Sequence, residues 1–144
     1  MTTLDFQYSQ KFMIGINVEE MDQMELVGIS FINFGSSSQT EALIVVQEAR
    51  ENSTLTVSNC SFNSGPGTVF GEFVSIFSLQ DAIHLRTLFE YTIFESNSCV
   101  IAKGTGVFQV HSCQFSNNNK TLFDLLGGHL FIDKTSFVGN HECK

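Results

Sequence analysis

The sequence of 144 residues has few charged residues (15%), a single proline and no tryptophan. Lys and Arg together number 7 against 15 Asp and Glu, which gives a formal net charge of −8. Nucleic acids and anionic membrane surfaces are bound by clustered lysine and arginine, so this balance argues against both as partners. No apolar run approaches the roughly 20 residues that a membrane-spanning helix needs. The first residues, Met1 to Phe6, also lack the basic and apolar regions of a signal peptide.

Apolar residues make up 42% of the chain, and they include 15 phenylalanines. Disordered proteins contain few aromatic residues and many charges, so this composition excludes disorder. The length is that of one domain, which is large enough to bury a core.

Five segments of the chain repeat the same pattern, and each ends in a phenylalanine. Successive anchor phenylalanines lie 31, 32, 21 and 22 residues apart. The two longer spacings are expected to contain loops of about ten extra residues, because insertions in solenoids collect in loops. Candidate loop segments are residues 35–40, 47–53 and 65–68. The anchors are Phe31, Phe62, Phe94, Phe115 and Phe137.

The residues seven and five positions before each anchor are apolar in nine of ten cases, Thr87 being the exception. Two positions before the anchor stands a smaller residue, among them Cys60 and Cys113. This is the period-2 alternation of a strand, interrupted by a bend. Three positions after the anchor, glycine or asparagine recurs, and these residues favour a left-handed turn. The predicted turn residues are Gly65, Asn97, Asn118 and Asn140.

Coils of about twenty residues with short strands and turns predict an all-β parallel β-helix of about five coils, since a single coil cannot bury its apolar face alone. The coils are expected over residues 24–144, with residues 1–23 forming an N-terminal cap or an incomplete coil. Because the pattern breaks off just after Asn140, the chain is expected to be a piece of a longer solenoid or to stack on another chain. The structural alternative is an antiparallel β-sandwich, which explains the alternation but not the aligned columns.

The four cysteines are interpreted as small core residues rather than as disulfides. Cys60 and Cys113 share a column two coils apart, or roughly 9–10 Å, whereas disulfide Cα atoms lie within about 7 Å. A bridge between Cys99 and Cys143 stays open as an alternative. The pairs His111-x-Cys113 and His141-x-Cys143 fall on different sides of the coil and are not predicted to bind zinc, which needs convergent ligands.

The last repeats read Gly127-Gly128-His129-Leu130 and Phe137-Val138-Gly139-Asn140, and two further anchors open Phe-x-x-Asn at Phe94 and Phe115. These motifs resemble the GGxL and FxxN repeats of polymorphic outer-membrane proteins of chlamydiae and similar surface proteins. The resemblance implies a right-handed parallel β-helix that serves at a cell surface as an adhesin or a structural stalk. It implies no catalytic residues.

The sequence therefore predicts a non-catalytic structural or adhesive solenoid, without catalytic, cofactor or metal residues, that contacts neighbouring chains or the rest of a longer chain. The alternative is a β-helix that binds or degrades glycans, and glycans are a second expected class of partner. Glycosylation sequons at Asn52, Asn59 and Asn119 fall in predicted loops or on a corner, which favours an extracellular or cell-surface location. A cytoplasmic location is left open.

Overall fold

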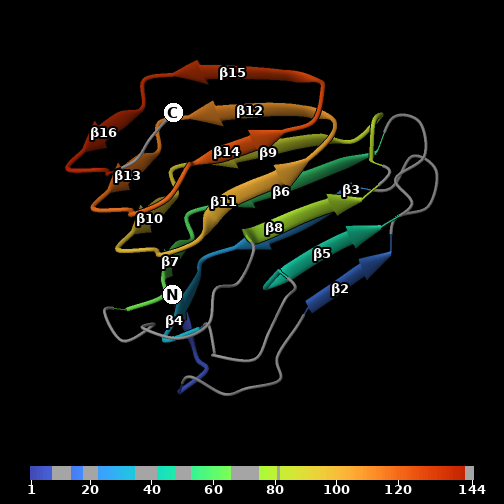
Figure 1. Cartoon of the computed structure of the whole chain (residues 1–144). Coiled ribbons are helices and arrows are strands. Elements are labelled where there is room, and N and C mark those ends of the chain that lie inside the picture. Colours follow the sequence, from blue (N-terminus) through green and yellow to red (C-terminus); the bar gives the residue numbers. More distant parts are fainter. Residues whose placement is uncertain are drawn as a thin grey trace.

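The computed structural model describes residues 1–7, 14–17, 23–34, 42–47, 53–65, 75–80 and 82–141. Within these ranges the regular structure consists of 16 β-strands and no helix (Figure 1). The strands form three sheets, and the strand pairs in all three are parallel. The chain visits the sheets in a fixed order, so every three strands complete one coil of a parallel β-helix. The predicted all-β solenoid is confirmed, and the antiparallel sandwich is wrong.

We name the sheets A, B and C in the order in which the chain enters them. Sheet A contains β1 (Thr2–Asp5), β4 (Ile29–Ile32), β7 (Ser61–Asn63), β10 (Ile93–Glu95), β13 (Gln114–Ser116) and β16 (Ser136–Val138). Sheet B contains β2 (Ile14–Asn17), β5 (Ile44–Gln47), β8 (Ser75–Gln80), β11 (Val100–Gly104) and β14 (Phe123–Leu125). Sheet C contains β3 (Gln23–Val27), β6 (Thr54–Ser58), β9 (Arg86–Glu90), β12 (Val107–His111) and β15 (His129–Asp133).

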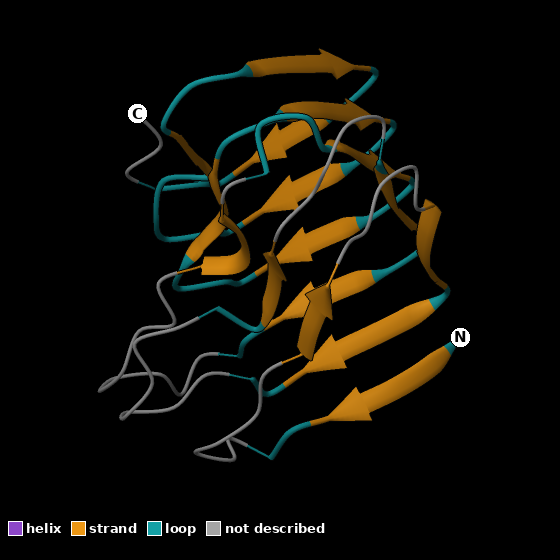
Figure 2. Ribbon diagram, turned by 90° about the vertical axis from the view of Figure 1, so that its right-hand side faces the viewer, coloured by secondary structure: helices purple, strands orange, loops and turns teal. Residues whose placement is uncertain are grey.

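Strands of each sheet lie one above the other and point the same way (Figure 2). Their register places each anchor phenylalanine directly over the previous one, for example Phe94 on Phe62 and Phe115 on Phe94. In sheet C the apolar pairs also align, as Val110 does with Phe89 and Ile132. Alternate residues of a strand point to opposite faces, so the aligned apolar residues fill the space inside the coils and form the core.

The corner between sheets C and A is built from residues in the left-handed conformation. In every coil one residue there has a positive φ, and four of the five carry a side chain. The cost of about 1 kcal/mol or more for a side chain in this region persists only where the structure around it fixes the conformation. These residues are Gly28, Asn59, Tyr91, Ser112 and Lys134, with φ values of 67°, 51°, 48°, 52° and 48°.

The corner between sheets A and B corrects one prediction. Asn97, Asn118 and Asn140 lie at this corner but are not the left-handed residues, which come one position earlier in the chain at Ser96, Asn117 and Gly139. The asparagine side chains instead point inward, because each one bonds to the backbone of the coil before it. Of the predicted turn residues only Gly65 has a positive φ, of 78°.

The corner between sheets B and C explains the glycine pair of the last repeat. Gly128 has a φ of 105°, and a Cβ atom placed there would run into the carbonyl oxygen of Gly106 in the coil below. Only glycine lets the two backbones approach so closely.

Residues 1–23 contribute two strands to the solenoid within their described part. β1 pairs with β4 and β2 pairs with β5. Together with β3 these two strands form the first coil of the solenoid. The candidate loops 35–40 and 66–68 and most of 47–53 lie outside the described residues, as does Cys143.

Candidate interaction surface at the C-terminal end

The anchor phenylalanines form one continuous aromatic column inside the coils. Neighbouring rings from Phe31 to Phe137 are stacked with centroid distances of 4.6, 5.2, 4.9 and 5.1 Å and interplanar angles of 4° to 10°. Phe31, Phe62, Phe94 and Phe115 are completely buried. Phe137 differs, because 47% of its surface is exposed at the last coil. It is a half-buried end of the column and not the core residue that the sequence predicted.

A second column, the asparagine ladder, consists of Asn97, Asn118 and Asn140. The Nδ2 group of Asn97 donates to the carbonyl oxygen of Phe62 at 3.0 Å and to Oδ1 of Asn118 at 3.0 Å. Asn118 repeats both bonds, to Phe94 at 2.9 Å and to Asn140 at 2.9 Å. The backbone N–H of each residue also donates to the Oδ1 of the next. These bonds satisfy amide groups that would be costly to bury unpaired.

The asparagine ladder has a direction. Asn97 and Asn118 each give the backbone N–H and one Nδ2 proton to the coil that follows, and Ser64 begins the series by donating its N–H to Oδ1 of Asn97. Asn140 is the last member, and its Nδ2 group donates back to Phe115 at 2.8 Å. By the pattern of the ladder, its N–H and second Nδ2 proton are directed at the open end of the solenoid.

The column of small residues alternates cysteine and threonine. The Cys60 N–H donates to Oγ1 of Thr92 at 3.4 Å, and the Cys113 N–H donates to Oγ1 of Thr135 at 3.3 Å. Cys60 and Cys113 are free and buried thiols. Burial raises the pKa of both thiols above the usual value, so they stay protonated and unreactive near neutral pH.

The C-terminal face of the solenoid, which we define by β14, β15 and β16, exposes positions that are buried in the core of the middle coils. Leu130 and Ile132 occupy the columns of the buried Leu55 and Val57 but are 36% and 46% exposed. Phe123 and Leu125 of β14 are only partly buried. Each of the three strands is the last of its sheet, and an edge strand presents backbone N–H and C=O groups that can pair with another strand.

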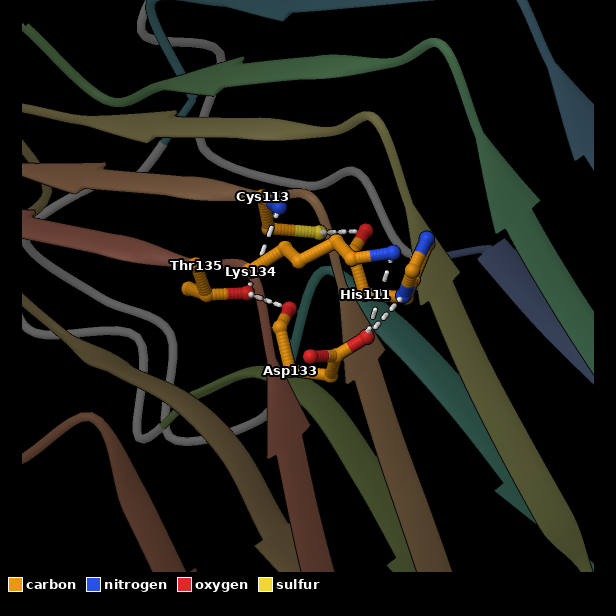
Figure 3. A network of polar contacts seen from close by, with 5 residues as sticks. All are labelled: His111, Cys113, Asp133, Lys134 and Thr135. Atoms are coloured by element: carbon orange, nitrogen blue, oxygen red, sulfur yellow. Dashed lines mark hydrogen bonds and ion pairs between the residues drawn. The ribbon is translucent and has the colours of Figure 1, made fainter.

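A groove with a volume of about 720 Å³ runs across the outer side of sheet C, next to this face. Its polar side is the column Glu90, His111 and Asp133, and its apolar side includes Leu88 and Phe131. The Nδ1 atom of His111 lies 3.0 Å from Oδ2 of Asp133, as Figure 3 shows. The Tyr91 ring meets the His111 ring edge-on at 5.9 Å.

The pairing of His111 with Asp133 was missed in the sequence, although both stand four positions before an anchor. The repeat places both residues in the same column, but a shared column in the sequence does not indicate that two side chains are in contact. Lys134 reaches the same carboxylate at 3.9 Å (Figure 3). All three side chains are substantially exposed, where such ion pairs contribute little to stability.

Of the remaining predicted sites, Asn59 lies beside the groove, since its backbone N–H donates to the carbonyl oxygen of Glu90 at 3.0 Å. Asn59 and Asn119 are exposed, as a glycosylation acceptor must be, and Asn52 lies outside the described residues. Among the described residues no group of three metal-ligating side chains converges. In the same part of the chain there is no helix that could cross a membrane.

Comparison of the chain with protein-family models, curated proteins and solved structures finds no match. The resemblance to the polymorphic outer-membrane proteins therefore stays a prediction from the sequence motifs.

Proposed function

We propose that this chain is a non-catalytic structural or adhesive solenoid that assembles with other protein chains through its C-terminal face. The observation that carries the proposal is the exposed end of the core at Leu130, Ile132 and Phe137. Exposed apolar positions that continue an internal core are favourable to bury, at about 25 cal/mol per Å² of apolar surface. The backbone edges of the same three strands add directional hydrogen bonds.

The parallel β-helix is well suited to a structural role because its strength does not depend on a single site. The coils are held together by the aromatic column and by backbone pairing in all three sheets, and the last three coils also by the asparagine ladder. Each coil of such an array is stabilised by the coils next to it. The glycosylation sequons at Asn59 and Asn119 and the motif resemblance favour a cell-surface location for this role.

The test is light scattering of the whole chain over a wide range of protein concentrations. We expect reversible association of the wild-type chain that is lost in Phe137→Asp, because a charge at the end of the aromatic column opposes burial. The matched control is Ile83→Asp, since Ile83 is also exposed (61%) but lies in a corner far from the last coil in the sequence. A wild-type chain that stays monomeric at every concentration, or equal loss in both variants, would overturn the proposal.

Glycan binding is the second candidate function, and the groove on sheet C favours it. Carbohydrate sites combine an exposed aromatic surface with polar groups that can both donate and accept hydrogen bonds. Phe131 supplies such a surface with 57% exposure, and His111, Asp133 and Gln109 supply the polar groups. Binding on a glycan array that is lost in Phe131→Ala but kept in Phe137→Asp would favour this function, and an array without a signal would count against it.

A further inference from the structure

The number of strands in each sheet limits how two copies of this chain can stack. Sheet A has six strands, whereas sheets B and C have five each. The described strands thus both begin and end in sheet A, with β1 and β16. A coil added beyond β16 has to pair first with β14 in sheet B and then with β15 in sheet C. The strands β2 and β3 of a second copy fit these two places, but its β1 would need the place that β16 already occupies.

We propose that copies assemble head to tail by strand exchange, in which β16 of one copy replaces β1 of the next. This rests on the proposed function, since it names the partner of the C-terminal face as a second copy of this chain. β2, β3 and β4 of the incoming copy would then cover β14, β15 and β16 in the order that the coil requires. The contact joins two different faces and adds each copy along the axis of the solenoid, so it produces an open chain of copies.

The inward-facing residues of the two ends match in all three sheets. In sheet C, the column that holds Leu130 and Ile132 begins with Met24 and Leu26. In sheet B, the column that holds Phe123 and Leu125 begins with Ile14 and Ile16. In both sheets the exchange thus sets apolar residues against apolar residues.

The outward-facing residues of the two ends are also compatible. In the same register Asp133 would stand beside Val27, and Phe131 would stand beside Glu25. In sheet B, Asp124 would lie beside Gly15. None of these pairs sets like charges against each other, which would oppose pairing of neighbouring strands.

Within sheet A the exchange improves the aromatic column. Leu4 of β1 occupies the column position above Phe31, and the ring of Phe6, two residues further on, stacks on Phe31 at 6.3 Å, a longer distance than between any two anchors. Replacing β1 by β16 would put Phe137 at this position, and the other anchors show that phenylalanines stack there at 4.6 to 5.2 Å. Stacked aromatic pairs contribute about 0.5–1.5 kcal/mol beyond their area.

β1 is the first strand of sheet A and is paired on one edge only. All four of its residues are exposed, and Leu4 is 38% exposed. β1 is held by backbone pairing with β4, by a hydrogen bond from the Asn33 side chain to Asp5 at 3.0 Å, and by the buried ring of Phe6, which stacks on Phe31 at 6.3 Å. In the exchanged state these contacts are released, β16 pairs with β4 in their place, and β16 becomes an internal strand of a continuous sheet.

The contact between two copies is weaker than the contact between neighbouring coils of one chain, because the asparagine ladder does not continue from one copy to the next. Asn140 would face the coil of Phe34, which has no asparagine side chain to accept its two amide protons. A junction that lacks these bonds dissociates more readily than an internal coil, so the assembly is expected to be reversible.

The experiment compares full-length variants in the same light-scattering assay. Leu4→Asp puts a charge at the inward position of β1 and weakens its attachment, so we expect association at protein concentrations lower by about tenfold or more. Thr3→Asp is the matched control, because Thr3 lies on the same exposed strand and points to the opposite face. The double variant Leu4→Asp/Phe137→Asp is expected to be monomeric.

Mixing two variants gives a second measurement, which non-specific association would not change. The N-terminal coil of a Phe137→Asp copy can still receive β16 of another copy, but its own β16 cannot replace β1 of the next. A small fraction of this variant should therefore shorten assemblies of Leu4→Asp chains. Strand exchange is wrong if Leu4→Asp leaves association unchanged, or if the double variant associates as strongly as Leu4→Asp alone. Association of the wild-type chain that depends on Phe137 but not on Leu4 would overturn the exchange and leave the proposed function standing.

Discussion

Replacing Phe115 with alanine tests the aromatic column at its most enclosed point near the C-terminal end. The ring is stacked between Phe94 and Phe137 at 4.9 and 5.1 Å and meets the edge of Phe123 at 5.7 Å. It is completely buried, so the truncation leaves a cavity and should lower the free energy of unfolding by about 3–5 kcal/mol. With a urea slope of about 2 kcal/mol per M, the midpoint should fall by about 2 M.

Phe137→Ala is the matched comparison, because it removes the same ring from the same column. Phe137 stacks on a single neighbour and is 47% exposed, so the expected loss is about 1–2 kcal/mol. Both losses can be measured by urea unfolding at low protein concentration, where association does not contribute. A loss below about 1 kcal/mol for Phe115→Ala, or equal losses for the two variants, would refute the argument that the column stabilises the fold through burial.

Three further outcomes follow from the polar and small residues of the interior. Asn118→Leu removes four side-chain hydrogen bonds and should lower the free energy of unfolding by about 3 kcal/mol or more. Asn119→Asp, at the exposed neighbouring position, should change the free energy of unfolding in urea by less than about 0.5 kcal/mol. Equal effects of the two variants would contradict the role of the asparagine ladder. Thr87→Val should raise the free energy of unfolding by about 1 kcal/mol, because the buried Thr87 hydroxyl has no hydrogen-bond partner among the residues that the structure describes; a lower urea midpoint would contradict this. Cys60 and Cys113, whose thiol pKa values are raised by burial, should react with an alkylating reagent at pH 8 far more slowly in the folded chain than in urea, and equal rates would show that the columns are open.

The coils could be predicted from the sequence because their columns repeat residue types and not only hydrophobicity. An antiparallel sandwich also alternates apolar and polar residues, but it has no reason to put phenylalanine at Phe62, Phe94 and Phe115 in one register. Parallel stacking supplies that reason, since identical rings stack on each other at the spacing of neighbouring strands. The regularity of the motif therefore carried information about topology that alternation alone lacks.

The first coil was harder to recognise because it departs from the motif at the column position. Leu4 stands where later coils have phenylalanine, and the next phenylalanine, Phe6, lies two residues beyond that position. The strand Thr2–Asp5 is also exposed at every residue, whereas buried and partly buried residues alternate in strands of the middle coils such as Thr54–Ser58 and Val107–His111.

The role of the asparagines could not be read from spacing, because two functions of asparagine compete at adjacent positions. Asparagine tolerates the left-handed conformation, and it also satisfies buried backbone groups with its amide. In the coil of Phe115 the two functions fall on Asn117, with a φ of 54°, and on the buried Asn118. The sequence shows both residues but not which side chain points inward.

The direction of the asparagine ladder makes the two ends of the solenoid chemically different. Asn97 accepts from Ser64 and donates to Asn118, so the backbone N–H and one of the two Nδ2 protons point toward the C-terminal face. The N-terminal coils lack asparagine in this column and offer Phe34 there instead. Two C-terminal faces that met would bring donors against donors, and would also run their strands in opposite directions. A C-terminal face that meets an N-terminal coil keeps the strands parallel and the apolar columns aligned, which is why head-to-tail contact is the arrangement that this interior favours.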